Sequence, residues 1–158
     1  MKYARLTKEQ FEELHQEFIN FLATQSITAA EWEDLKKQQP EIVEQELDIF
    51  SDLIWEGVLG KVSYLDHIAP HSMQLFFFDK EQIHLIAVKV DESVTNFMTY
   101  EGLRWLEEHI MDETVSLYTA SKSYSDDRFT DIFLFIKQGA VISDGTLYRS
   151  LQQFMKTS

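Results

Sequence analysis

Two segments near the middle of the chain are rich in aromatic and β-branched residues and are separated by three polar residues. They are Ser72–Phe78 and Gln82–Val90, with Asp79, Lys80 and Glu81 between them. This pattern favours two strands joined by a tight turn. Both segments contain runs that are apolar on both faces, and such strands are usually covered on both sides. The sequence therefore predicts a hairpin enclosed between two further layers.

A second strand pair is expected at Thr114–Thr119 and Phe129–Ile136, and a helix is expected after each pair. One helix is capped near Thr99 and the other begins at Ser143 or Asp144. Residues 72–156 are thus predicted to form two strand–strand–helix units in a four-stranded, mainly antiparallel sheet. The two helices can cover one face, which leaves the other face to the N-terminal helices or to a second copy in a homodimer. Because Thr114–Thr119 alternates most clearly, we expect it at an edge of the sheet.

The first third of the chain has helical periodicity. Apolar residues recur at helical spacing, which predicts helices over residues 7–25, 28–38 and 40–60. Capping patterns mark the first two helix starts, at Thr7 and Thr28. The third helix is expected to begin at Pro40 and to end at Gly60. The fold class is therefore α+β, with these helices packed on the sheet. Because no low-complexity linker divides the chain, a single domain over residues 1–158 is expected, with a helical part (1–60) and a sheet part (72–156).

The composition restricts the partners. The 27 Asp and Glu residues against 14 Lys and Arg residues give a net charge of −13. Such a surface repels nucleic acid and anionic lipid and attracts a basic protein. The chain has no cysteine, no apolar segment long enough to span a membrane and no signal-peptide pattern near Met1. We expect a cytoplasmic protein.

The helix predicted over residues 40–60 has the most informative surface. Its buried stripe is expected to be Val43, Leu47, Phe50, Ile54 and Val58. Another side carries four carboxylates at i, i+4 spacing, namely Glu44, Asp48, Asp52 and Glu56. A helical wheel places Trp55 and Leu59 on this acidic side as well. Like charges at this spacing cost about 0.2–0.5 kcal/mol per pair, so either solvent screens them or a cation neutralises them. Trp55 and the carboxylates form a candidate partner-binding site, and the alternative is a solvated face with Trp55 packed under residues 61–70.

A second set of polar residues suggests a ligand pocket instead. Asp66, His67 and His71 lie close together, but Pro70 interrupts any regular spacing. The segment 121–128 is dense in polar groups, of which Lys122, Tyr124, Asp126 and Asp127 are candidate ligand-binding residues. We predict no metal site, no cofactor and no catalytic residue, because nucleotide-binding, zinc-protease and hydrolase motifs are all missing from the sequence.

Three stretches resemble an uncharacterised family of short bacterial proteins. They are Met1–Gln25, the run from Glu44 to Gly57 (EQELDIFSDLIWEG) and the run from Thr119 to Asp127 (TASKSYSDD). The resemblance covers nearly the whole chain and implies a bacterial, cytoplasmic protein with no assigned activity.

Two functions therefore stay open. The leading hypothesis is a non-enzymatic protein whose acidic helix face binds a basic protein partner, since opposite charge speeds encounter. The alternative is a small enzyme or ligand-binding domain with a pocket at the end of the sheet near residues 121–128.

Overall fold

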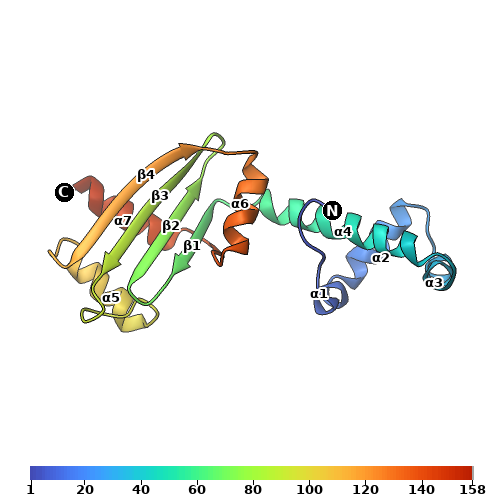
Figure 1. The fold of residues 1–158 in the computed structure, drawn as a ribbon, viewed down its shortest axis with the longest axis horizontal. Coiled ribbons are helices and arrows are strands. Elements are labelled where there is room, and N and C mark those ends of the chain that lie inside the picture. The colour runs from blue at the N-terminus through green and yellow to red at the C-terminus, as the bar shows by residue number, and fades with distance from the viewer. Residues whose placement is uncertain (158) are drawn as a thin grey trace. The chain divides into compact units, whose positions relative to one another are not determined.

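The computed structural model describes residues 1–157, and they group into two compact units, residues 1–60 and residues from 61 onward. The first unit is helical and the second contains a sheet with three helices (Figure 1). Whether the two units fold as a single domain, and whether the helices of the first pack on the sheet of the second, stay predictions.

The helices of the first unit begin where the capping patterns predict. They are α1 (Lys8–Glu13), α2 (His15–Thr24), α3 (Ala29–Gln38) and α4 (Pro40–Leu59). Thr7 and Gln10 form the expected capping box, Thr28 caps α3, and Pro40 opens α4. The helix expected over residues 7–25 is interrupted at Leu14. Phe50 is buried at the centre of the aromatic core of this unit, with the rings of Phe18 and Phe21 at 5.0 and 5.4 Å from its own.

The second unit is built on an antiparallel sheet of five strands in the order β4-β3-β2-β1-β5. Its elements are β1 (Tyr64–Ile68), β2 (Ser72–Phe78), β3 (Gln82–Val90), α5 (Tyr100–His109), β4 (Val115–Ser123), α6 (Arg128–Lys137), β5 (Val141–Ser143) and α7 (Thr146–Thr157). The predicted hairpin of β2 and β3 is confirmed, as is the edge position of β4. The turn at Asp79 is also confirmed, since the Asp79 carboxylate accepts hydrogen bonds from the backbone N–H groups of Glu81 and Gln82.

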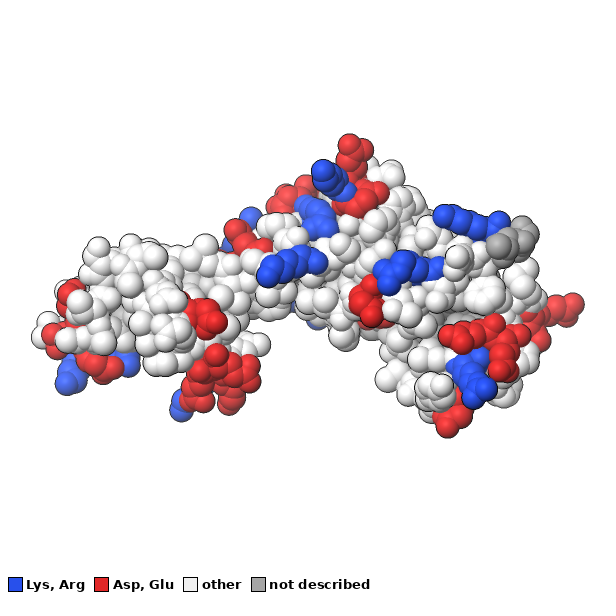
Figure 2. Space-filling model, turned by 180° about the vertical axis from the view of Figure 1, so that it is seen from behind, with Lys and Arg blue, Asp and Glu red and all other residues white. Residues whose placement is uncertain are grey.

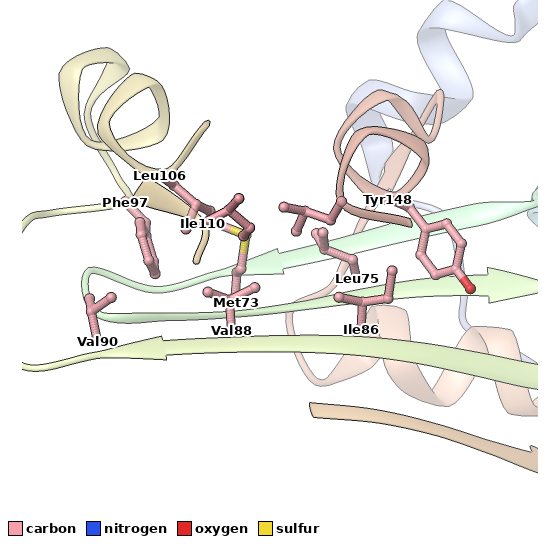
Figure 3. Close-up of a cluster of buried hydrophobic side chains, with 10 residues drawn as sticks. Met73, Leu75, Ile86, Val88, Val90, Phe97, Leu106, Ile110 and Tyr148 are labelled. Carbon is pink, nitrogen blue, oxygen red and sulfur yellow. The ribbon is translucent and has the colours of Figure 1, made fainter. Parts of the chain in front are cut away.

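Helices α5 and α7 cover one face of this sheet, as predicted. Strand residues on this face are buried against apolar residues of the two helices and of the segments that flank α5 (Figure 3). Met73, Leu75, Ile86, Val88 and Val90 pack in one cluster with Phe97, Leu106, Ile110, Tyr148 and Leu151. Burial of this area supplies the main stabilisation of the unit.

The prediction of a four-stranded sheet was wrong at Phe129–Ile136, which forms helix α6. Its run of apolar residues suits a buried strand or a buried helix equally. Asp127 decides the outcome locally, because its carboxylate caps the helix by accepting the N–H and hydroxyl hydrogen bonds of Thr130. Ile132 and Phe133 are then buried, whereas Leu134 is 49% exposed, which is the periodicity of a helix.

Two short strands were missed. β1 occupies part of the segment expected to be a loop, and β5 has only three residues. Neither has an alternating apolar pattern of its own, so both depend on pairing with a neighbour. In addition, β4 extends to Ser123, so that only residues 124–127 connect it to α6.

Helix α6 lies on the face of the sheet opposite α5 and α7. The ring of Phe135 lies 4.5 Å from that of Phe76 and 5.9 Å from that of Phe78. The both-sided burial expected for β2 is thus achieved at this end of the strand. Farther along, Ser72 and Gln74 on the same face are exposed, and this open part of the sheet is turned toward the viewer in Figure 1.

Candidate functional surfaces

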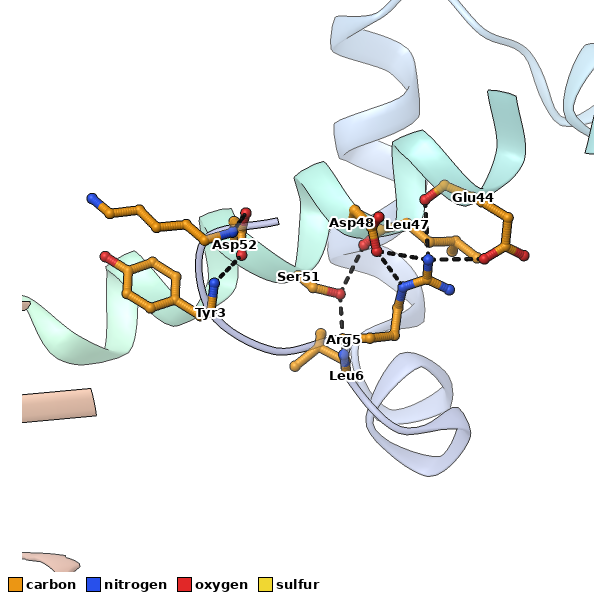
Figure 4. Close-up of polar contacts among 9 residues, drawn as sticks. Tyr3, Arg5, Leu6, Glu44, Leu47, Asp48, Ser51 and Asp52 are labelled. Atoms are coloured by element: carbon orange, nitrogen blue, oxygen red, sulfur yellow. Dashed lines mark hydrogen bonds and ion pairs between the residues drawn. The ribbon is translucent and has the colours of Figure 1, made fainter. Parts of the chain in front are cut away.

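The N-terminal segment of the chain binds the acidic side of α4 (Figure 4). The Asp52 carboxylate accepts hydrogen bonds from the backbone N–H groups of Lys2, at 2.7 Å, and Tyr3, at 2.9 Å. At the preceding residue, the fully buried Ser51 hydroxyl accepts the N–H of Leu6 at 3.1 Å and donates to the carbonyl of Leu47 at 2.7 Å. The segment therefore satisfies its backbone donors on side chains of α4.

Arg5 forms ion pairs with two further carboxylates of this side. Its guanidinium lies 2.6 Å from the Asp48 carboxylate and 2.8 Å from that of Glu44, and it also donates to the Glu44 carbonyl. Lys2 and Glu56 form a longer, exposed pair at 3.6 Å, a kind that contributes little. The four predicted partner-binding carboxylates thus contact the chain's own N-terminal segment, in which Lys2 and Arg5 supply positive charge beside them.

The helical-wheel assignments on α4 need correction at Val58 and Leu59. Val58 is 38% exposed, whereas Leu59, placed on the acidic side by the helical wheel, is completely buried. Trp55 is half-buried and packs against the aromatic core of the first unit. Whether residues 61–70 cover Trp55, the alternative given above, stays a prediction. The wheel failed because α4 contacts neighbours on more than one side, which a single amphipathic stripe cannot represent.

A third side of α4 carries apolar residues that the wheel did not single out. Ile49 and Leu53 lie one turn apart and are 47% and 53% exposed. Ile42 and Glu46 extend this row at spacings of four and three residues, and both are half-buried. Among residues 1–157, no group donates a hydrogen bond to the buried Oε2 atom of Glu46. We call the row Ile42, Glu46, Ile49 and Leu53 the α4 strip.

The predicted ligand-binding residues do not meet in one cavity. His67 lines a cavity of about 500 Å³ on the open face of the sheet, whereas Lys122 lines smaller neighbours of about 270 and 160 Å³. His71 lies in the turn between β1 and β2, and Asp126 is exposed. Asp127 caps α6. Tyr124 donates its hydroxyl to the carbonyl of Asp79, and burial raises the pKa of this phenol.

Asp79 joins three parts of the second unit. Its carboxylate holds the β2–β3 turn and lies 2.7 Å from Nε2 of His84, whose Nδ1 lies 2.7 Å from the Ser121 hydroxyl on β4. Its carbonyl accepts hydrogen bonds from Tyr124 and Arg128. Hydrogen bonding to His84 and to the turn backbone lowers the pKa of Asp79 to about 2. Sequence spacing gives no signal for this cluster, because antiparallel pairing alone places Ser121 opposite His84.

The contacts run from the Ser121 hydroxyl to the His84 imidazole and from there to the Asp79 carboxylate. In a catalytic triad the same three groups serve as nucleophile, base and orienting carboxylate. Ser121 is exposed on an edge strand. The cavity of about 270 Å³ that touches Ser121 also contacts its neighbours Ala120 and Lys122. Because side chains alternate along a strand, the Ser121 hydroxyl lies on the opposite face of β4 from those neighbours. This geometry suits a structural link between β3 and β4.

The open face of the sheet has an unusual charge for this chain. Among residues 1–157, Lys89 and His67 line the cavity of about 500 Å³ and no carboxylate does. On the opposite, helix-covered side of the second unit, acidic and basic side chains are interspersed (Figure 2). The open face therefore differs in sign from the acidic chain as a whole, whose net charge is −13.

Residues 1–157 contain no group of three or more His, Asp or Glu side chains arranged to hold a metal ion. None of their helices combines the length and the apolar character that a membrane crossing requires.

Comparison with known families identifies this chain. The profile of a family of unknown function, DUF6495, matches residues 1–156. The chain therefore belongs to this family, in agreement with the resemblance to an uncharacterised family. No curated protein and no solved structure was found to match it.

Proposed function

We propose that this protein is a non-enzymatic binding protein that docks a basic protein partner on the α4 strip. The observation that supports the proposal best is the exposure of Ile49 and Leu53, 47% and 53%, on adjacent turns of one helix. Paired apolar residues at i, i+4 are the anchors that an amphipathic partner helix uses. Removing them from water supplies affinity in proportion to the buried area.

The charges beside the α4 strip favour a basic partner over an acidic one or a second copy. Glu46 is part of the strip. Asp52 and Glu56 each lie three residues after an apolar residue of the strip, Ile49 and Leu53, and so border it on the helix surface. A Lys or Arg side chain of the partner would be attracted to the negative charge of Glu46. Opposite charge also increases the association rate.

The N-terminal segment supports the same chemistry. Lys2 and Arg5 already bind the carboxylates of α4 within the chain. The originally expected site at Glu44, Asp48 and Asp52 would therefore be open to a partner only after this segment is displaced. The α4 strip needs no such displacement, so we propose it as the primary contact.

Binding of a synthetic helix tests this proposal. A labelled amphipathic Leu/Lys peptide is expected to bind, and a Leu/Glu peptide with the same apolar face is not. Replacing Ile49 and Leu53 together by Ala should weaken binding of the Leu/Lys peptide about tenfold or more, because two apolar contacts are lost. Fluorescence anisotropy measures both affinities.

The matched control is Ile19→Ala on α2, where the residue is 42% exposed. This variant should bind the Leu/Lys peptide like the unchanged protein. Equal weakening by the control, or equal binding of the two peptides, would exclude the α4 strip as a specific site for a basic partner.

A second candidate function is a small hydrolase at the sheet end near residues 121–128. The contacts of His84 with Ser121 and Asp79, both at 2.7 Å, favour it. Covalent labelling of Ser121 by a fluorophosphonate, read by mass spectrometry, is expected if His84 activates the hydroxyl. Labelling that is absent, or equal at Ser123 and in a His84→Gln variant, would reject this candidate.

The proposal retains two expectations that follow from composition. With a net charge of −13, the protein is expected to avoid nucleic acid, and the lack of cysteine suits a cytoplasmic location.

A further inference from the structure

The open face of the sheet contains a concave site bounded by side chains of four strands. One row crosses β1, β2, β3 and β4 as His67, Gln74, Ala87 and Tyr118, and these four residues pair in register. They line a cavity of about 500 Å³. This volume is in the range of small-molecule sites, about 300–1,000 Å³.

The charges in this cavity select the ligand. Lys89 and His67 line it, and within residues 1–157 neither side chain forms an ion pair with a carboxylate. The chain has 27 acidic residues, yet none of them lines this cavity. An unneutralised ammonium group beside neutral donors such as Gln74 and Ser116 favours an anion.

The shape of the site adds a second requirement. Tyr118 is 63% exposed at one side of the cavity, while Ala69 and Ala87 contribute only methyl groups. An exposed aromatic ring above a floor of small residues leaves room for a flat group to stack on it. On the other side, an added Cβ at Gly139 would lie 3.3 Å from Nε2 of His67, so the glycine leaves space for the imidazole.

We propose that this face binds a small organic anion, a phosphate or carboxylate carried on a planar ring. Lys89 and His67 hold the anionic group, and Tyr118 stacks on the ring. The site lies in the second unit and is independent of the α4 strip. Its success or failure therefore does not bear on the partner proposed for α4.

Matched probes test the site on the intact protein. Phenyl phosphate and benzoate carry both a ring and a charge, inorganic phosphate lacks the ring, and phenol lacks the charge. In amide NMR titrations, the two ring-bearing anions should give saturable shifts at residues 67, 74, 87, 89, 116 and 118. Inorganic phosphate and phenol should bind at least about fivefold more weakly, since each retains one of the two contacts.

Two substitutions and a control complete the experiment. Lys89→Gln and Tyr118→Ala should each weaken phenyl phosphate about fivefold or more, while Lys80→Gln in the exposed β2–β3 turn should leave it unchanged. Shifts that do not saturate, or equal losses in Lys89→Gln and Lys80→Gln, would overturn the proposal. So would a stable dimer in light scattering whose interface protects Tyr118, because a second copy would then cover the face.

Discussion

Single carboxylates in this protein hold backbone segments in place. Asp52 accepts two N–H groups of the N-terminal segment, and Asp79 accepts two from its own turn. Asp131, which is only 5% exposed, accepts the N–H groups of Ser125 and Asp126 before α6. Hydrogen bonds to charged acceptors are stronger than neutral ones. These three carboxylates therefore have structural roles.

For a single residue, the pKa of Asp79 tests the contact between its carboxylate and His84. His84→Gln should raise this pKa from about 2 toward its ordinary value of 3.8, because the hydrogen bond from His84 is the largest cause of the shift. A carboxyl-carbon NMR titration measures it. The pKa of Asp112, which hydrogen bonds from Thr114 keep low, should stay unchanged in the same variant.

The sign of the accompanying stability change follows from linkage. Because the folded pKa of Asp79 is depressed, its stabilising contribution is present above pH 3.8 and is lost as pH falls toward 2. In His84→Gln the loss across this window should be smaller. An unchanged Asp79 pKa would show that His84 does not stabilise the carboxylate.

At the scale of elements, two glycines in helices give opposite predictions. An added Cβ at Gly57, inside α4, meets no atom within 4 Å, whereas one at Gly102 in α5 would lie 1.7 Å from the carbonyl oxygen of Asn96. Gly57→Ala should stabilise the protein by about 0.5–1 kcal/mol, because alanine restricts the unfolded chain. Gly102→Ala should destabilise it by about 3 kcal/mol, because the backbone must shift.

Urea unfolding of both variants measures these changes, and each variant serves as the control for the other. Stabilisation by both substitutions would mean that the loop at Asn96 does not pack against α5 as described.

Elements with strong local signals were predictable from the sequence. The hairpin of β2 and β3, the caps of the N-terminal helices and the helix after Thr99 all have polar signals next to regular apolar patterns. Helix α6 was not predictable from its apolar run, which fits both a strand and a helix. Strands β1 and β5 exist because neighbours pair with them, and such non-local contacts leave little trace in a local pattern.

For the whole molecule, charge and sites are distributed unevenly. The chain carries a net charge of −13, yet within residues 1–157 the cavity on the open sheet face is lined by Lys89 and by no carboxylate. The acidic side of α4 is bound by Lys2 and Arg5 of the same chain. The net charge of a protein sets its long-range attraction for a charged partner. Which surface that partner can bind depends on local contacts within the chain.

The α+β class, most helix boundaries, the central hairpin and the row of carboxylates on α4 follow from local sequence patterns. These patterns are periodicity, capping and composition, which act over a few residues. What lies against each surface depends on the folded chain: Arg5 pairs with Asp48 of α4, Ser121 lies beside His84, and α6 covers only one end of the open face. Such contacts join residues 37 to 59 positions apart, and no local pattern records which distant segment will bring its side chain there.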